Sequence, residues 1–141
     1  MLTAVIAVAL FGLVTALVVA VARDPGLPPE DVALAYEQAW NGLDFDALWT
    51  LSGAELRDGM SRKEYSAAKR TAYATRPDLH DLALAVQVEQ VDTGRDISTI
   101  RTHLTLRGGS DTRNELQLVR RSERWLVVGY HLLGSTESRP D

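Results

Sequence analysis

Residues 35–53 read AYEQAWNGLDFDALWTLSG and gather aromatic and acidic side chains into two short helical segments. Apolar residues recur here at spacings of three and four, which predicts one buried face on a helix that begins near Pro29. These residues are Val32, Tyr36, Ala39, Trp40 and Leu43. Gly42 is expected to end this helix, and Asp44 to cap a second helix that Gly53 ends.

A third helix is predicted by two spacings at its N-terminus. Ser61 and Glu64 have the spacing of a capping box. Met60 and Tyr65, on either side of the cap, have the spacing of a hydrophobic staple. The helix is expected to end before Pro77, because proline removes a backbone donor and restricts the residue before it. Its inward positions are expected to be Tyr65, Ala68 and Ala72.

Four strands are predicted from residue 82 onward, where the apolar period changes to two. The first carries Leu82, Leu84, Val86 and Val88 on one face. The second covers residues 98–107, the third about residues 112–121, and the fourth, RWLVVGYHLL, residues 124–133. Their connections are too short for a crossover helix, so the strands are expected to be antiparallel. The fourth strand is apolar on both faces, which favours a central position in the sheet.

Helices followed by an antiparallel meander resemble the NTF2-like (cystatin-like, SnoaL-like) superfamily. Residues 35–53 are similar to the opening of these domains, an aromatic residue and then Ala-x-x-x-x-Asp-x-x-x-Leu. Residues 122–133, SERWLVVGYHLL, are similar to their closing strand, which begins with Trp. The resemblance covers residues 29–133 and implies an α+β cone, in which three helices pack on a curved four-stranded antiparallel sheet. In this family, a cone that its own side chains leave unfilled becomes a pocket.

The first 22 residues contain no charged side chain and are long enough to cross a bilayer once as a helix. We therefore expect a single-pass cell-membrane protein that contacts lipid through residues 2–22. The alternative is a signal peptide cleaved after Ala20-Val21-Ala22, although no basic residue precedes the apolar run. Residues 23–28 are expected to be a short, stiff linker, and the positive-inside rule applied to Arg23 favours a cytoplasmic domain.

Composition limits the partners and cofactors of the domain. The formal net charge is -4 with the signs interspersed, which argues against nucleic acid as a partner. The absence of Cys excludes disulfides and thiolate metal sites. His80, His103 and His131 lack the close spacing of metal ligands, and no phosphate loop is present, so no metal or cofactor is expected. The polar residues 134–141 are expected to form a disordered tail.

Five aromatic residues are expected around the inside of the cone: Tyr36, Trp40, Trp49, Tyr65 and Trp125. Aromatic side chains bury large areas, so packing is favoured over ligand stacking for these residues. A polar cleft beside them stays open as an alternative, because buried Tyr and Trp need hydrogen-bond partners.

The resemblance to the superfamily also directs attention to acidic and histidine side chains. Its enzymes, among them ketosteroid isomerase-like and polyketide cyclase-like members, use an Asp or His base inside the cone. Here Asp44 is explained as a helix cap, Asp46 by the helix dipole, and His103 by sharing a strand face with Arg101. His131, on a strand apolar on both faces, is either a satisfied core histidine or a base tuned by burial. His131 and Asp46 are thus the candidates, and no catalytic residue is assigned.

No convergent polar set is visible, which favours a non-catalytic binding or assembly module held at the membrane. A protein partner or a second copy is expected to bind the sheet face. Comparable architectures occur among bacterial Mce-associated proteins and conjugation-machine assembly factors, whose domains lie outside the cytoplasm, in conflict with the charge rule. The alternatives are a small-molecule isomerase or cyclase, and a carrier of a lipophilic ligand. Both alternatives require an open pocket in the cone.

Overall fold

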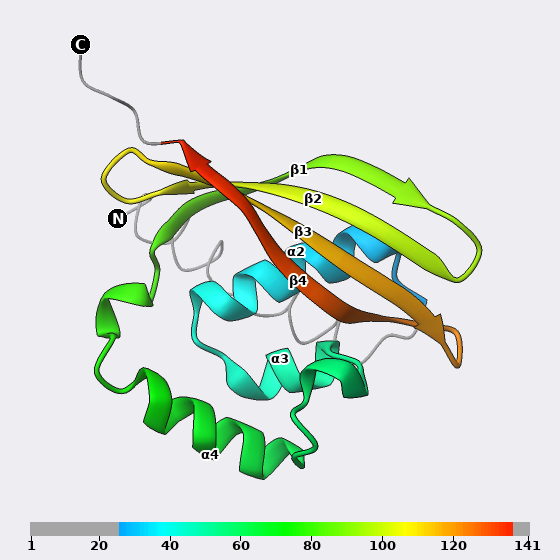
Figure 1. The fold of residues 1–141 in the computed structure, drawn as a ribbon, viewed down its shortest axis with the longest axis horizontal. Helices are drawn as coiled ribbons and strands as arrows, with labels where there is room; N and C mark the ends of the chain where they lie inside the picture. Colours follow the sequence, from blue (N-terminus) through cyan, green and yellow to red (C-terminus); the bar gives the residue numbers. More distant parts are fainter. Residues whose placement is uncertain (1–25, 137–141) are drawn as a thin grey trace, which may run out of the picture.

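The computed structural model describes residues 26–136, which form helices first and a sheet afterwards. The helical elements are α2 (Pro29–Asn41), α3 (Phe45–Leu51), η1 (Ala54–Leu56), α4 (Arg62–Tyr73) and η2 (Pro77–Leu79). The strands are β1 (Ala83–Thr93), β2 (Ile97–Leu106), β3 (Asp111–Arg121) and β4 (Arg124–Thr136). They pair antiparallel in the order β1-β2-β3-β4 (Figure 1). The predicted α+β architecture of three α-helices and a four-stranded antiparallel sheet is confirmed.

The predicted membrane segment, residues 1–22, lies outside the described residues. Between residues 26 and 136, no helix combines the length and the apolar character needed to cross a bilayer.

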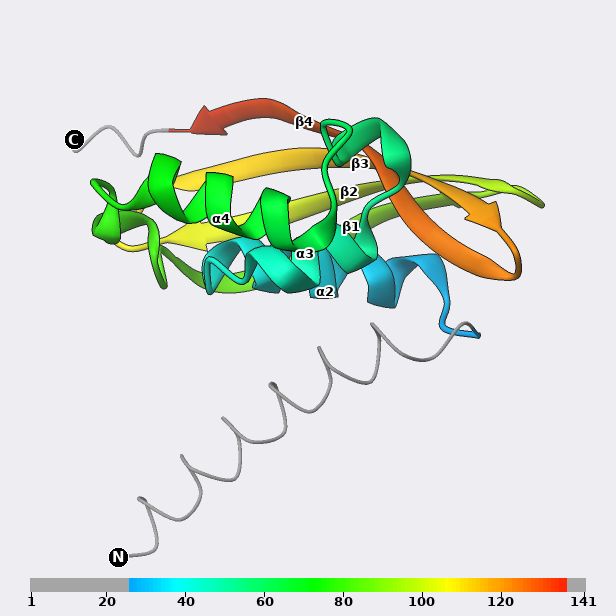
Figure 2. The same cartoon turned by 90° about the horizontal axis from the view of Figure 1, so that it is seen from below.

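The core lies between the sheet and the first two helices. Figure 2 shows the strands as one curved layer with α2 beneath it. Ile100, Leu116, Leu118 and Val127 project from the sheet and are completely buried. They belong to one apolar cluster with α2 and α3 residues such as Ala33 and Leu48. We call the sheet face toward α2 the inner face and the opposite one the outer face.

The predicted helix caps are present. Asp44 accepts a hydrogen bond from the backbone N–H of Ala47 at the start of α3. Ser61 accepts from the Glu64 backbone N–H, and the Glu64 side chain accepts from the Ser61 N–H, which completes the capping box of α4. Gly42 follows the last residue of α2 as expected.

The predicted inner face of α4 is only partly correct. Tyr65 is buried in the core, whereas Ala68 and Ala72 are exposed. The reason is that α4 packs against α3 and not against the sheet, so it buries a narrow strip of its surface. A helix in this second layer needs fewer inward positions than one that lies directly on the sheet.

The prediction of a central fourth strand is wrong, because β4 lies at the edge of the sheet. Residues after α3 cover part of that edge. Ser52 forms a parallel bridge with Val127, and the Gly53 N–H donates to the Val127 carbonyl at 2.8 Å. This cover explains why an edge strand carries apolar residues on both faces. The strand also continues to Thr136 by pairing with the start of β3, so it includes residues that were expected in the tail.

The first strand departs from simple alternation. The pairing of β1 with β2 shifts between Ala83 and Ala85 and again between Val88 and Gln90. Leu84 therefore does not face inward as predicted, and it is 67% exposed. Each shift adds one unpaired residue, which turns the following side chains to the opposite face.

Candidate functional site

A cavity of about 620 Å³ lies between the C-terminal half of α2 and the inner face of the sheet. Its wall is mainly apolar, with leucines contributed by the α2–α3 turn, the region of η2, and the strands β2 and β4. These are Leu43, Leu79, Leu82, Leu104, Leu106 and Leu132. Trp40, Tyr73 and Tyr130 add aromatic rings to the same wall. A volume of this size is typical of small-molecule sites.

Glu37 supplies the only carboxylate among the described residues that line the cavity. The residue is 1% exposed, and its two oxygens receive hydrogen bonds from three strands. Thr102 donates to Oε1 at 2.8 Å, and Tyr130 donates to Oε2 at 2.7 Å. Asn114 donates to Oε1 at 3.1 Å and also donates to the Tyr130 hydroxyl at 2.8 Å. The carboxylate is thus fixed at the polar end of an otherwise apolar cavity.

The surroundings of Glu37 act on its proton affinity in two directions. Burial raises the pKa of Glu37 above its ordinary value, and hydrogen bonds from Tyr130, Thr102 and Asn114 act in the opposite direction. Burial and the adjacent carboxylate also raise the pKa of Tyr130, so its hydroxyl keeps its proton and donates to Glu37. The site therefore combines a carboxyl group of raised proton affinity with donors that are neutral.

Local sequence patterns explain why these four side chains converge. Glu37 follows Ala33 by four residues and precedes Trp40 by three, so it lies on the buried face of α2. Thr102 and Asn114 are directly paired across β2 and β3 on the inner face. Tyr130 lies on the inner face of β4, two residues before Leu132, and Leu132 is the residue paired with Asn114.

Two sets of hydrogen bonds hold the rim of the cavity. The Asn41 side chain accepts from the Ala83 N–H at 2.8 Å and donates to the Ala83 carbonyl at 3.1 Å, which ties the end of α2 to β1. Arg107 donates to the carbonyls of Asp78 and His80, which ties the η2 region to the end of β2. At the other side of the rim, Leu132 is 70% exposed.

Of the five aromatic residues expected inside the cone, Trp40 lines this cavity, with its ring centroid 5.7 Å from that of Tyr73. Tyr36 lies in the core with its ring edge toward Tyr130, at a centroid distance of 5.1 Å. Tyr65 is also in the core, where burial raises its pKa to about 12. The remaining two are not among the lining residues: Trp49 donates to the Met60 carbonyl, and Trp125 packs against the core at the start of β4.

The two candidate bases lie outside the cavity. His131 is exposed on the outer face, where it lies opposite Glu115 in the register of β3 and β4. It is therefore neither a core histidine nor a base tuned by burial. The alternation of β4 turns Tyr130 inward and His131 outward. Asp46 is exposed in the first turn of α3, where it accepts from Ser66 and lies 3.6 Å from Arg70.

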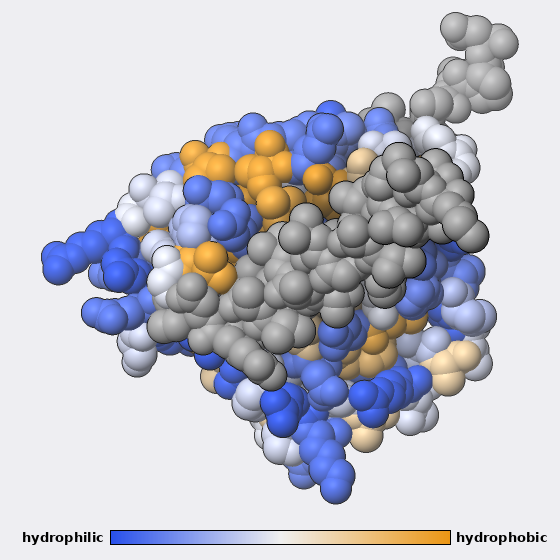
Figure 3. All heavy atoms as spheres, turned by 180° about the vertical axis from the view of Figure 1, so that it is seen from behind, coloured by the Kyte–Doolittle hydropathy of each residue, from blue (hydrophilic) through white to orange (hydrophobic). Residues whose placement is uncertain are grey.

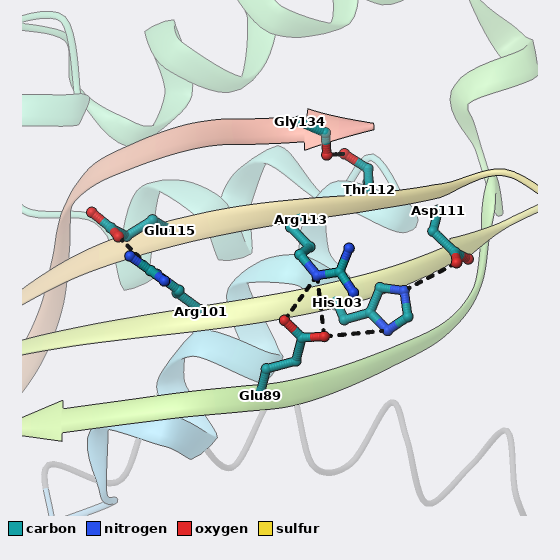
Figure 4. A network of polar contacts seen from close by, with 8 residues as sticks. All are labelled: Glu89, Arg101, His103, Asp111, Thr112, Arg113, Glu115 and Gly134. Carbon is teal, nitrogen blue, oxygen red and sulfur yellow. Dashed lines mark hydrogen bonds and ion pairs between the residues drawn. The ribbon is translucent and has the colours of Figure 1, made fainter. Parts of the chain in front are cut away.

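The outer face carries a network of charged side chains (Figure 4). Glu89 lies at the second shift of β1, and its Oε2 is 3.0 Å from Arg113 Nε. His103 lies between two carboxylates, 3.7 Å from Glu89 and 3.3 Å from Asp111. These groups are largely paired with one another, and none of them lines the cavity. Within residues 26–136, no group of three His, Asp or Glu side chains is arranged to hold a metal ion.

The described surface outside the cavity carries scattered apolar residues. Seen from the helix side, apolar atoms form separate patches between polar ones (Figure 3). Exposed large apolar residues include Val91 and Ile97 at one end of the β1–β2 hairpin and Leu132 and Leu133 at the end of β4. Only Leu132 in this group lines the cavity. The cavity with its buried carboxylate is therefore taken as the candidate site.

The sequence pattern did not single out Glu37 as a buried residue. Its spacing from Ala33 and Trp40 was the signal that could have found it. The inward position of Thr102 beside Ile100 and Leu104 was a second such signal. Polar residues at inward positions of a helix and a strand indicate a buried polar cluster.

Solved structures that resemble this fold include two with TM-scores above 0.5. One is described as an NTF2-like transpeptidase from Campylobacter jejuni; it has a TM-score of 0.55 and 16% identity, and the match covers 72% of this chain and 97% of that chain. The other is a SEC-C motif containing protein from Rhodopseudomonas palustris, with a TM-score of 0.60, 19% identity, and coverage of 83% and 87%. These likenesses confirm the expected NTF2-like fold and concern the fold alone. No protein-family model matches the sequence, and a search of curated proteins finds no match.

Proposed function

We propose that this domain is a non-catalytic binding module whose cone holds a lipophilic small molecule. The observation that carries the proposal is the cavity of about 620 Å³, with a leucine-rich wall and a single buried carboxylate at one end. Burying apolar ligand surface against such a wall supplies the free energy of binding, at about 0.8 kcal/mol for each buried CH₂ group. The hydrogen-bonded cluster around Glu37 fixes the position of the polar part of the ligand.

A binding role is favoured over catalysis because Glu37 is the one carboxyl group among the described lining residues, and no second acidic or basic side chain lies opposite it there. Apart from Glu37, the described lining residues include no acidic side chain and no His, Lys or Arg. General acid–base catalysis of an isomerase or cyclase requires donors and acceptors placed on both sides of the reacting atoms. The three donors here are already directed at Glu37.

The test is binding of n-octanol to the full chain in phosphatidylcholine nanodiscs, measured by calorimetry with empty nanodiscs subtracted. Leu132→Glu places a charge at the rim and is expected to weaken binding by about fivefold or more, because the site loses apolar contact. Leu133→Glu is the matched control, since Leu133 is exposed on the same strand but does not line the cavity. Absence of saturable binding, or equal effects of the two variants, would refute the proposal.

We also propose that residues 2–22 anchor the domain in a cell membrane as a single span. The support is the length and apolar character of this segment and the short proline-rich linker after it. Anchoring places the cavity near lipid, which is a source of lipophilic ligands. Extraction of cell membranes at high pH is expected to leave the full chain in the membrane pellet. Recovery of a shortened chain in the soluble fraction would instead support cleavage after Ala22. Protease protection in sealed vesicles then tests the cytoplasmic side favoured by Arg23.

A further inference from the structure

The hydrogen-bond partners of Glu37 are suited to an ionised carboxylate. Its partners are a hydroxyl, an amide and a phenol, contributed by Thr102, Asn114 and Tyr130. All three can donate to the oxygens of an ionised Glu37, in which state the carboxylate accepts every one of these hydrogen bonds. The donors stabilise the negative charge but carry no positive charge. A buried carboxylate without a positive partner is unfavourable.

The protein supplies no such partner within the described lining of the cavity. No Lys, Arg or His is among these residues. The basic side chains near the sheet have other contacts: Arg113 pairs with Glu89 on the outer face, and Arg107 binds loop carbonyls at the rim. The negative charge at the end of the cavity is therefore left for a ligand to balance.

The other residues around the carboxylate suit a cation. Trp40, Tyr73 and Tyr130 line the same cavity, and aromatic rings attract positive charge over their faces. Glu37 Oε2 is the more weakly bonded of the two oxygens: it accepts from Tyr130 at 2.7 Å and from Asn114 at 3.4 Å, whereas Oε1 accepts at 2.8 Å and 3.1 Å.

We propose that the ligand of this cavity is a lipophilic amine, whose protonated nitrogen pairs with the Glu37 carboxylate while its hydrocarbon part lies among the leucines. This inference rests on the proposed ligand-binding function and adds the charge of the head group. A fatty-acid anion is the disfavoured alternative, because its carboxylate would lie beside a like charge with no cation between them. A neutral alcohol fits the apolar wall equally well but leaves the charge of Glu37 unbalanced.

The experiment compares three ligands that share one hydrocarbon chain: n-octylamine, n-octanol and n-octanoate. Binding to the full chain in phosphatidylcholine nanodiscs is measured by calorimetry near neutral pH, with empty nanodiscs subtracted. The wild-type protein is expected to bind octylamine about tenfold more tightly than octanol, and octanoate more weakly than octanol. Octanol binding without a preference for octylamine would overturn the amine inference and leave the proposed function standing. Failure of all three ligands to bind would overturn both.

Glu37→Gln is the matching variant, because it removes the charge and keeps the shape of the side chain. In this variant, octylamine is expected to bind no more than about threefold better than octanol. Glu123→Gln is the control, since Glu123 is exposed in the β3–β4 turn and is not a lining residue. This substitution removes the same charge outside the cavity. A tenfold preference for octylamine that survives in Glu37→Gln would contradict the pairing.

A measurement on the wild-type protein alone covers the case in which Glu37→Gln does not fold. Glu37 must be ionised to pair with an ammonium group, so octylamine binding is expected to weaken as the pH falls. At acidic pH, where free Glu37 is protonated, binding is also expected to release protons. Tyr130, which also lines the cavity, keeps its proton, because burial and the adjacent Glu37 raise its pKa. Calorimetry in two buffers of different ionisation enthalpy measures the protons released. Octylamine binding with no proton release and no loss of affinity at acidic pH would overturn the inference.

Discussion

Tyr130→Phe removes the shortest hydrogen bond to the buried carboxylate and leaves the ring in place. The Tyr130 hydroxyl donates to Glu37 Oε2 at 2.7 Å and accepts from Asn114 at 2.8 Å. A hydrogen bond to a charged group contributes about 1.5–3 kcal/mol to stability. Asn114 keeps its bond to Glu37, so we expect Tyr130→Phe to lower the free energy of unfolding by about 2 kcal/mol at about pH 8.

The pH dependence of this loss follows from the role of the hydroxyl as a donor. Donation from Tyr130 opposes the effect of burial on the pKa of Glu37, so its removal raises that pKa further. At acidic pH the carboxyl group is protonated in both proteins, and the bond becomes one between neutral groups, which contributes about 1 kcal/mol. The cost of Tyr130→Phe is therefore expected to shrink as the pH falls.

Tyr73→Phe is the matched control, because Tyr73 lines the same cavity and no hydrogen bond of its hydroxyl to the described residues is present. Its cost is expected to stay within about 0.5 kcal/mol. The assay is urea unfolding of the full chain in nanodiscs, followed by tryptophan fluorescence at alkaline and acidic pH. Equal costs for the two variants, or a cost of Tyr130→Phe that does not change with pH, would refute this description of Glu37.

Three further substitutions test other parts of the structure. Glu37→Gln should become more stable relative to wild type as the pH rises. Burial raises the pKa of Glu37 in the folded state, so the stability of the wild-type protein falls as the pH rises from the unfolded-state pKa of Glu37 through its folded-state pKa. Urea unfolding across pH measures the difference in stability, and a difference that is flat or opposite in sign would contradict this prediction. Ser61→Ala should cost about 1 kcal/mol in the same assay by removing the capping box with Glu64, and a loss below about 0.3 kcal/mol would count against it. Glu123→Gly should raise the thermal midpoint by relieving up to about 1 kcal/mol of strain at a φ of 63°, whereas a lower midpoint would show that the turn does not need that conformation.

Local signals were sufficient to predict most of the fold. The spacing of Ser61 and Glu64, and the position of Asp44, fixed helix starts because capping depends on neighbours within one turn. The antiparallel meander followed from short connections, such as the two-residue turn between Arg121 and Arg124.

What the sequence pattern could not predict depends on contacts between distant residues. The edge position of β4 was missed because the cover provided by Ser52 and Gly53 is a tertiary contact. Leu84 was assigned to the wrong face of β1 because the alternating pattern around it contains no signal for the register shift between Ala83 and Ala85. His131 was assigned to a strand buried on both faces, whereas its side chain faces the solvent side of an edge strand.

Glu37 was missed for a different reason. Its three partners come from β2, β3 and β4, which are more than sixty residues away along the chain. A carboxylate that is stabilised by such distant donors cannot be distinguished from a solvated one by helical spacing alone. Only the folded arrangement shows that α2 carries this group at the end of an apolar cavity.

The most direct test of where a ligand lies is NMR of the full chain in nanodiscs with bound n-octylamine. We predict intermolecular NOEs from the octyl chain to the methyl groups of Leu104 and Leu106, and from the carbon next to nitrogen to the ring of Tyr130. NOEs confined to exposed apolar residues outside the cavity, such as Val91 and Ile97, would contradict the assignment of this cavity as the binding site.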